Sequence, residues 1–486
     1  MICVILLQVF GVVSVAEEVI LKSSSLLPIN AKDLNSVVNI CQEDFYPCTC
    51  ETYSWDLIPS LYVHCNEVPS FESVQAAFRR TTASQVKEFV LTIPSFEENK
   101  TIPANLLSGK AAQEITLICP NTETQLTVDP KAFNFSEDYT NFIKFSTCDL
   151  NQLDYTFLTN FNVLKEISYF NSNNFSQWYG LPSLPSLMKI SVDSSSDFKD
   201  FKNLAVSKLP ALSEYSIRLC PHFELLPNTT ATKKLRIESC PLFKEWDIVG
   251  RQSRLTSLSL ISLNNQTIEN ALDSIVSSSV VNTLAELILT YNGLTQVPSQ
   301  IQLFSQLQNV TLSDNNISTA GNRSLAFSTP KLQRLYLNRN GLSHFESEAF
   351  QGDFSVCQVL LGSNNLTKLE SSVFKSVLEQ MDATDIGSFT VDKNPFECDC
   401  DLAWIFRDNL HLRDQIKDGK CTNGSYFAEL GPKNFAYCNE ETNTSTTVTS
   451  STIQSTTIPS TDTASRPFQL LDPVLFLIIL FISISV

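Results

Sequence analysis

Hydrophobic and polar positions alternate in short stretches that recur along the chain with a regular period. Four stretches share the pattern apolar-x-apolar-x-x-Asn, and an apolar residue follows two places later: Leu287–Asn292, Val310–Asn315, Leu335–Asn340 and Val359–Asn364. They start at positions 287, 310, 335 and 359, so successive starts lie 23, 25 and 24 residues apart. Self-similarity at such a period indicates a solenoid of stacked repeats rather than several separate globular domains.

Each apolar-x-apolar segment predicts a short strand whose alternate side chains point inward. We expect the strands of successive repeats to pair in parallel, with the Asn side chain turned inward to satisfy backbone groups that the turn leaves unpaired. A second apolar set belongs to the convex side: Ala132-Phe133, Ala326-Phe327, Ala349-Phe350 and Val373-Phe374. The pattern becomes irregular toward the N-terminus, with strands expected at Phe89, Ile115, Ile143, Ile167, Ile190, Tyr215, Leu235 and Leu258, a further one at Leu61–Val63 and a last one at Phe389–Val391.

Three irregular repeats carry cysteine where the regular ones carry asparagine, namely Cys148, Cys220 and Cys240. Cysteine is small, apolar and tolerant of burial, so it can replace the inward asparagine. Cys220 and Cys240 occupy the same position in consecutive repeats, roughly one strand spacing of 4.8 Å apart. They are either a buried pair of thiols or a disulfide, and the pairing of Cys119, Cys148 and Cys357 is equally open.

Cysteine clusters flank the repeats at both ends, where a solenoid needs caps to cover its core. One cluster holds Cys41, Cys48, Cys50 and Cys65; the other is Asn394-Pro-Phe-Glu-Cys398-Asp-Cys400-Asp-Leu-Ala-Trp404 with Cys421 and Cys438. Repeats and flanks together resemble extracellular leucine-rich-repeat proteins of the arthropod type, among them a non-catalytic subunit of a luciferin monooxygenase. The resemblance implies an α/β solenoid, a leucine-rich-repeat horseshoe of about 12–13 repeats with a parallel concave sheet and short convex helices. It also implies the disulfides Cys41–Cys50, Cys48–Cys65, Cys398–Cys421 and Cys400–Cys438.

Both terminal segments read as targeting signals. The apolar run Ile2–Val15 ends at small residues, which predicts a signal peptide cleaved after Ala16. Cys3 is lost with it, so thirteen of the fourteen cysteines remain in an oxidising compartment that favours disulfides. Thirteen mostly apolar residues follow Pro473, fewer than the roughly 20 that span a bilayer. With the small residues 462–464 and the spacer 465–473 they match a lipid-anchor signal with Asp462 as the attachment residue; the alternative is a short membrane helix from Phe468.

The boundaries between these features divide the chain into six parts. We expect a signal peptide (1–16), an N-terminal segment with its cysteine-rich cap (17–66), the repeats (67–392), a cysteine-rich C-terminal cap (393–438), a Ser/Thr-rich stalk (439–467) and a hydrophobic tail (468–486).

Charge and the lack of catalytic motifs narrow the function. With 51 acidic against 34 basic residues the net charge is −17, which disfavours binding to nucleic acid. The four histidines are scattered, and neither a nucleophile elbow nor a phosphate-binding glycine loop occurs. The Cys-x-Cys pair lacks the two-residue spacing of zinc knuckles. We therefore expect no catalytic residues, no metal and no cofactor.

Function is then expected on the exposed side chains of the concave strands. The outward positions are Lys144, Arg218, Arg236, Glu238, Tyr291, Asp314, Tyr336 and Arg339, of which Tyr291, Tyr336 and Arg339 are the preferred binding residues because tyrosine and arginine often anchor interfaces. Tyr336 and Arg339 are expected side by side. Sequons for N-glycosylation occur at Asn99, Asn134, Asn174, Asn228, Asn265, Asn309, Asn316, Asn322, Asn365, Asn423 and Asn443, with Asn309 next to the concave face.

These observations favour a cell-surface ectodomain on the outer side of the plasma membrane that recognises an extracellular protein or glycoprotein. The alternative is a non-catalytic scaffold subunit of a secreted enzyme complex, similar to the luciferin-monooxygenase subunit. Because one leucine-rich-repeat scaffold serves many partners, the sequence leaves the ligand open.

Overall fold

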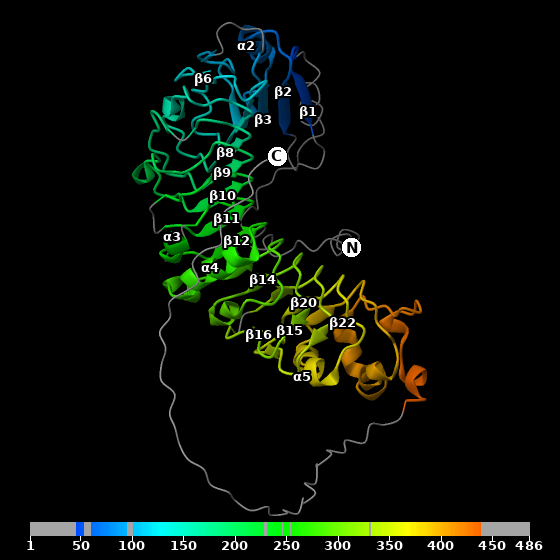
Figure 1. Ribbon diagram of the computed structural model, residues 1–486. Coiled ribbons are helices and arrows are strands. Elements are labelled where there is room, and N and C mark those ends of the chain that lie inside the picture. The colour runs from blue at the N-terminus through cyan, green and yellow to red at the C-terminus, as the bar shows by residue number, and fades with distance from the viewer. Residues whose placement is uncertain are drawn as a thin grey trace, which may run out of the picture. The chain divides into compact units, whose positions relative to one another are not determined.

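The repeats build one long sheet, shown in Figure 1 by a computed structural model of the chain. The structure describes residues 45–52, 60–94, 101–175, 177–227, 231–244, 246–252, 254–329 and 332–438, apart from the side chains of 247 and 248. The chain up to Cys438 is one unit and residues 439–486 are a second. The expected signal peptide, Cys41, the stalk and the tail lie outside the described residues.

Sixteen strands pair in chain order. Those before the regular repeats are β1 (Thr49–Thr52), β2 (Leu61–Cys65), β3 (Gln85–Thr92), β5 (Ala111–Ile118), β7 (Phe142–Ser146), β8 (Glu166–Phe170), β9 (Lys189–Asp193), β10 (Glu214–Arg218), β11 (Lys234–Glu238) and β12 (Ser257–Ile261). The rest are β13 (Glu286–Ile288), β14 (Asn309–Thr311), β17 (Arg334–Tyr336), β20 (Gln358–Leu360), β21 (Ser388–Thr390) and β22 (Ile416–Lys417). Every pair from β2 onward is parallel, and only β1 runs antiparallel to its neighbour. The parallel solenoid is confirmed.

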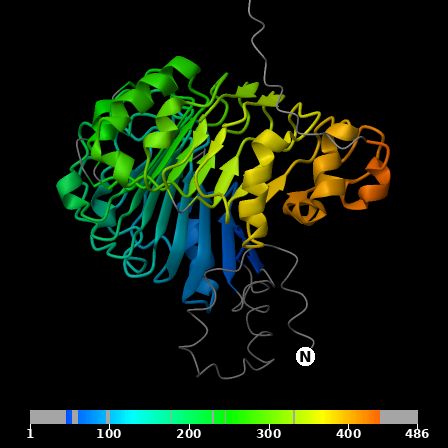
Figure 2. The same ribbon diagram turned by 90° about the horizontal axis from the view of Figure 1, so that it is seen from below.

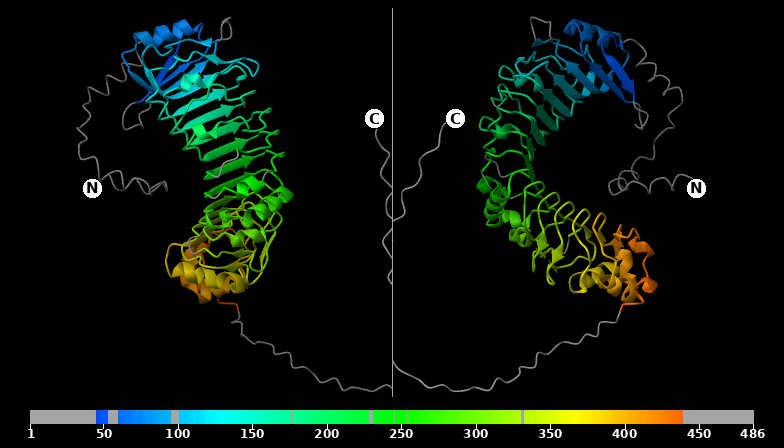
Figure 3. Two further views of the ribbon diagram at one scale, coloured as in Figure 1. Left: turned by 90° about the vertical axis from the view of Figure 1, so that its left-hand side faces the viewer. Right: turned by 45° about the vertical axis from the view of Figure 1, so that its right-hand side comes forward.

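The sheet lines the inner side of the arc, and the connecting segments lie outside it (Figures 1 and 2). The strands follow one another like rungs (Figure 3). The outer segments include α2 (Phe71–Arg80), α3 (Trp246–Gly250), α4 (Asn265–Val276), α5 (Ser371–Asp382), the 3-10 turns η1 (Tyr155–Leu158), η2 (Val206–Lys208), η3 (Ser279–Asn282) and η4 (Ser299–Leu303), and three two-stranded sheets of β4 (Thr101–Ile102) with β6 (Thr127–Val128), β15 (Thr319–Ala320) with β18 (His344–Phe345), and β16 (Leu325–Ala326) with β19 (Phe350–Gln351).

Local sequence signals explain where two of the outer helices, α2 and α4, begin. Ser70 accepts a hydrogen bond from the Ser73 N–H at the start of α2, and Asn264 accepts one from the Thr267 N–H at the start of α4. Both helices bury one face at helical spacing against the core, in α4 through Ile268, Ala271, Leu272 and Ile275.

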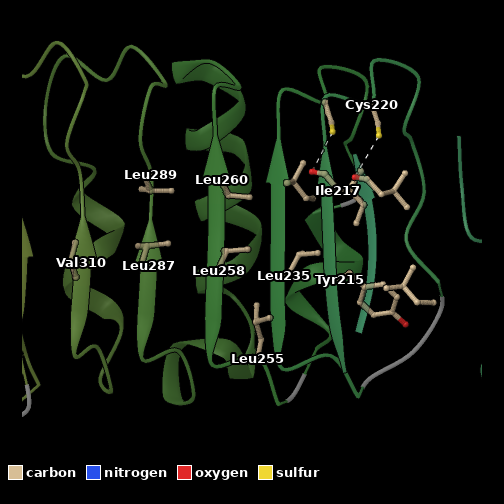
Figure 4. Packing of buried hydrophobic residues seen from close by; sticks show 14 of the residues in the cluster. Tyr215, Ile217, Cys220, Leu235, Leu255, Leu258, Leu260, Leu287, Leu289 and Val310 are labelled. Carbon is tan, nitrogen blue, oxygen red and sulfur yellow. Dashed lines mark hydrogen bonds between the residues drawn. The ribbon is translucent and has the colours of Figure 1, made fainter. Parts of the chain in front are cut away.

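Inward side chains form continuous ladders behind the sheet. The close-up in Figure 4 shows Leu235, Leu258, Leu287 and Val310 at one level and Ile217, Leu260 and Leu289 at the next, and all are buried. A third ladder, which the sequence analysis missed, is a stack of phenylalanine rings that runs through Phe175, Phe198, Phe223 and Phe243 with centroid separations of 4.8, 5.5 and 5.3 Å. Each of these residues lies three places after the position that asparagine holds in the regular repeats, which we call the ladder position. This constant spacing is the sequence signal that could have revealed the stack.

The ladder position behaves as expected in the regular repeats, where Asn292, Asn315, Asn364 and Asn394 are buried. The Asn315 amide donates to the Leu289 and Leu312 carbonyls at 2.7 and 2.9 Å and accepts from the Asn292 N–H at 3.0 Å. The irregular repeats use cysteine at Cys220 and Cys240 and also serine at Ser172 and Ser195, which the sequence analysis did not identify.

Disulfides lie in both flanks and between two neighbouring repeats. Cys48 bonds Cys65, Cys398 bonds Cys421 and Cys400 bonds Cys438. Cys50 is also disulfide-bonded, and its expected partner Cys41 lies outside the described residues. Cys148, whose pairing the sequence left open, bonds Cys119 of the preceding repeat across a Cα–Cα distance of 5.0 Å. Cys220, Cys240 and Cys357 are buried free thiols.

The C-terminal flank caps the core with its own elements, β22 together with η5 (Cys400–Leu402), the π-helical turn η6 (Trp404–Asp408), η7 (Leu410–Gln415), η8 (Phe427–Glu429) and η9 (Pro432–Phe435). Phe396, Phe406, Phe427 and Phe435 are buried and contact one another by their rings. The Trp404 indole N–H donates to the Leu369 carbonyl at 2.7 Å, which ties the cap to the last repeats.

Candidate functional site

Parallel register places the outward side chains of the sheet in rows. The middle row consists of the residue between the two inward residues of each strand, and from β9 to β21 it runs Ser191, Ser216, Arg236, Ser259, Ile288, Thr311, Tyr336, Leu360 and Thr390. Charge divides this face into two parts.

The part on β8–β11 carries charges that pair with one another. Lys189 contacts Glu166 at 3.0 Å and Lys234 contacts Glu214 at 3.1 Å. Arg218 contacts Asp193 at 3.0 Å and Glu238 at 2.9 Å, and Arg236 also contacts Glu238. We call these four acidic and four basic residues the charge ladder.

Two of the expected binding residues, Arg218 and Arg236, form ion pairs within the charge ladder. Burial acts to raise the pKa of Glu238, but the hydrogen bonds and charges of Arg236 and Arg218 outweigh it and hold this pKa below its usual range. The hydrogen bond with Glu238 in turn raises the pKa of Arg218. A partner that engaged these guanidinium groups would have to displace existing partners, so they offer little net charge for recognition.

The part on β12–β21 has an uncharged middle row, formed by Ser259, Ile288, Thr311, Tyr336, Leu360 and Thr390. We call these six residues the uncharged strip. Ile288, Tyr336 and Leu360 are partly exposed, so the strip offers apolar and aromatic surface. Arg334, which is exposed, lies beside it on β17. Depletion of charge at the centre with an aromatic residue and arginine at the margin is typical of protein-binding surfaces.

Three residues expected on strands lie elsewhere. Tyr291, Asp314 and Arg339 follow the strands in turns where each adopts left-handed backbone, with φ of 57°, 58° and 53°. The expectation that they project from strands was wrong, because the chain turns inward toward the ladder asparagine one residue later and leaves the strand before them.

These turn residues form a cluster at the edge of the sheet. The Arg339 guanidinium donates to both carboxylate oxygens of Asp314, with the Nη2–Oδ2 distance at 2.7 Å. This hydrogen bonding raises the pKa of Arg339, and the neighbouring Tyr291 adds to the shift. The Tyr291 side chain is 60% exposed. Arg339 therefore pairs with Asp314 rather than with Tyr336, which lies on β17 within the strip.

The sequons fall on several parts of the molecule. Asn309 starts β14 between Glu286 and Arg334, so it lies on the concave face. Asn174, Asn316, Asn322, Asn365 and Asn423 are exposed, and Asn134 and Asn265 are half-buried. Asn99, Asn228 and Asn443 lie outside the described residues.

A search for groups of three or more His, Cys, Asp or Glu side chains that could hold a metal ion finds none in the described part of the chain. In the same residues, every helix is too short or too polar to cross a bilayer.

Known proteins give two comparisons, while no protein-family model matches the chain. Over 406 residues the chain is 23% identical to the non-catalytic subunit of Oplophorus-luciferin 2-monooxygenase from Oplophorus gracilirostris, an alignment that covers 82% of this chain and 88% of that protein. This similarity confirms distant homology to the subunit that the sequence resembles. Among solved structures, human 5T4 (Wnt-activated inhibitory factor 1, trophoblast glycoprotein) matches with a TM-score of 0.33 and 15% identity, over 56% of this chain and 88% of that structure.

Proposed function

We propose that this leucine-rich-repeat protein is a non-catalytic ectodomain on the outer side of the plasma membrane and that it binds an extracellular partner protein through the uncharged strip. One observation carries the proposal: the middle row of the concave sheet carries no charged residue from Ser259 to Thr390 and places Tyr336 and Leu360 on adjacent strands. Burying such a surface costs little desolvation, whereas the charge ladder would have to give up existing ion pairs.

The test uses the secreted ectodomain as bait for proximity labelling on intact cells, with mass spectrometry of the labelled proteins. Tyr336→Ala and Leu360→Glu should each lower recovery of the specific partner, and Tyr336→Ala should weaken its affinity by about fivefold or more, since an anchor residue contributes at least about 1 kcal/mol. Folding should hardly change, because both side chains point away from the core.

Two controls separate binding from folding. Leu337→Ala removes a fully buried neighbour of Tyr336 and should cost about 2–5 kcal/mol of stability. Lys189→Ala changes the same sheet outside the strip and should leave binding intact. If Tyr336→Ala and Leu360→Glu both keep the partner while a change on the convex side or in a cap abolishes it, the concave strip is not the binding surface.

A second candidate function is supported by the relative from Oplophorus gracilirostris, since the alignment covers 88% of a protein named as a non-catalytic subunit. On this reading the chain is a scaffold subunit of a secreted enzyme complex. Size-exclusion chromatography of culture medium distinguishes the two, because a subunit co-elutes with a partner enzyme whereas an anchored ectodomain stays with the cells.

Membrane attachment through residues 462–486 is part of the first proposal, supported by the small residues, the spacer and the apolar run in that segment. Treatment of intact cells with phosphatidylinositol-specific phospholipase C should release the protein into the medium. If the protein stays on the cells while a lipid-anchored control protein is released, a short membrane helix from Phe468 holds the protein instead of a lipid.

A further inference from the structure

A polar recess lies on the convex side, between η4 and the turn that joins β15 to β16. It has a volume of about 460 Å³, is open to solvent, and is lined by the polar residues Gln296, Ser299, Gln302, Thr319, Asn322 and Arg323. Small-molecule sites in proteins span roughly 300–1,000 Å³, so the recess has the size of a ligand site.

The recess exists because the convex structure changes there from one repeat to the next. β15 and β16 each pair with a strand of the following repeat, β18 and β19. The preceding repeat has the 3-10 turn η4 in place of strands, so in the described residues the two short sheets end at β15 and β16. The step between the turn and the open strand edges forms the hollow.

Asn322 lies at the rim of this recess within the sequon Asn322-Arg323-Ser324. Its side chain is exposed, and its Oδ1 accepts a hydrogen bond from the Glu348 N–H at 3.1 Å. Its backbone N–H donates to the Glu346 carboxylate at 2.8 Å. The side chain is thus held in place through its oxygen, while its Nδ2 makes no hydrogen bond with another described residue.

The lining also contains a group that lacks a partner. The Ser324 Oγ is buried without a hydrogen-bond partner in the described structure. A buried hydroxyl left unpaired costs free energy, so a ligand that supplied a hydrogen bond here would be favoured. The amides of Gln296 and Gln302, the hydroxyls of Ser299 and Thr319 and the Arg323 guanidinium are donors and acceptors of the kind that sugar hydroxyls and acetamido groups engage.

We propose that Asn322 carries an N-linked glycan and that its first N-acetylglucosamine unit lies in this recess as part of the folded structure. The inference rests on the proposed passage of the chain through the secretory pathway. There, transfer joins Asn322 Nδ2 to C1 of the first sugar; the bond between C1 and the oxygen of the lipid-pyrophosphate carrier breaks, the pyrophosphate leaves with the electron pair, and the amide nitrogen loses one proton. The exposed sequons at Asn316, Asn365 and Asn423 do not line the recess.

The experiment expresses the full chain in secretory cells that keep N-glycans in the high-mannose form, and maps each sequon by glycopeptide mass spectrometry. Hydrogen exchange is then followed after trimming with endoglycosidase H, which leaves one sugar on each occupied high-mannose site. Asn322 should be occupied. Backbone amides of 296–302 and 319–324 should exchange about fivefold faster in Ser324→Ala than in the trimmed wild type. Ser324→Ala removes the sequon but keeps the hydrogen bond from the Glu348 N–H to Asn322 Oδ1. Asn322→Gln, which also removes the sequon, should show the same faster exchange.

Two control variants test whether the sugar acts through the recess. Ser324→Thr keeps the sequon and should match the wild type. Asn423→Gln removes an exposed sequon in the C-terminal cap and should leave exchange at 296–302 and 319–324 unchanged.

Three outcomes would overturn the inference. If Asn322 is occupied and Ser324→Ala exchanges like the trimmed wild type, the glycan does not lie in the recess. If other sequons are occupied and Asn322 is not, the site is wrong while the secreted location stands. If no sequon is occupied, the secretory route fails too, and with it the extracellular part of the proposed function.

Discussion

At the scale of single residues, the ladder position shows why asparagine recurs in the regular repeats. Asn315 donates to the carbonyls of two successive repeats and accepts from the N–H groups of Asn292 and Leu294. The thiols of Cys220 and Cys240 donate to the carbonyls of Arg218 and Glu238 at 3.1 and 3.2 Å, and their contacts to the preceding repeat are longer, at 3.9 and 3.7 Å. An amide therefore satisfies more backbone groups than a thiol.

We expect Asn315→Ala to lower the free energy of unfolding by about 3 kcal/mol, because it leaves several buried backbone groups without partners. Urea unfolding followed by circular dichroism measures the change. The control Asn162→Ala alters an exposed asparagine in a turn and should stay within about 0.5 kcal/mol of the wild type. Equal stability of the two variants would contradict the role assigned to the ladder amide.

At the scale of elements, each repeat contacts its neighbours, and one covalent bond strengthens such a junction. The disulfide between Cys119 and Cys148 joins the segments that follow β5 and β7, 29 residues apart in the sequence. It lies on the N-terminal side of the irregular repeats, where the ladder has no asparagine. The bond links two repeats that lack the amide contacts of a ladder asparagine.

Replacing both cysteines, as in Cys119→Ser with Cys148→Ser, should lower the free energy of unfolding by roughly 3.5 kcal/mol, the loop-closure entropy for a loop of this length. Thermal unfolding without reductant gives the measurement. Cys357→Ser, which changes a buried thiol that forms no bond, is the matched control and should cost less. A smaller loss in the double variant than in this control would show that the disulfide does not stabilise the junction.

At the scale of the whole molecule, several weak acids are buried in the core of a chain with a net charge of −17. Burial raises the pKa of Tyr155, Tyr169 and Tyr215 above the usual value of 10, and raises that of Cys357 to about 12. Tyr155 and Tyr169 share a hydrogen bond of 2.9 Å between their hydroxyls, whereas the Tyr215 hydroxyl has no partner among the described residues.

These shifts predict a loss of stability in alkaline solution. The folded state holds these protons more tightly than the unfolded chain, so their contribution is complete below about pH 9 and falls as the pH rises through the raised values. Midpoints of thermal unfolding measured between pH 7 and pH 11 should decline above pH 9. The midpoint of the Tyr215→Phe variant should decline less steeply, because one of the titrating hydroxyls is gone. At pH 7 this variant should be at least as stable as the wild type, because it lacks a buried unpaired hydroxyl. A midpoint that stays constant up to pH 11 would contradict the prediction.

The sequence by itself determined the repeat, the strands, the ladder asparagines and the capped ends. These features follow from a local period: every Leu-x-Leu-x-x-Asn segment meets the same environment, so Leu335, Leu337 and Asn340 could be placed from one repeat alone. The free thiols at Cys220 and Cys240 stayed open, because equal positions in neighbouring repeats permit either a bond or two thiols.

Only the tertiary structure decided which outward side chains are available. Arg218 looks like a free interface residue until register brings Asp193 and Glu238, 25 and 20 residues away in the sequence, against it. Tyr291 and Arg339 lie in turns rather than on strands for a similar reason. The buried hydrogen bonds of the ladder asparagine that follows each of them fix where the turn starts. The recess beside Asn322 depends on a strand edge meeting a 3-10 turn of another repeat. Such properties arise between repeats, and a pattern read along one repeat does not contain them.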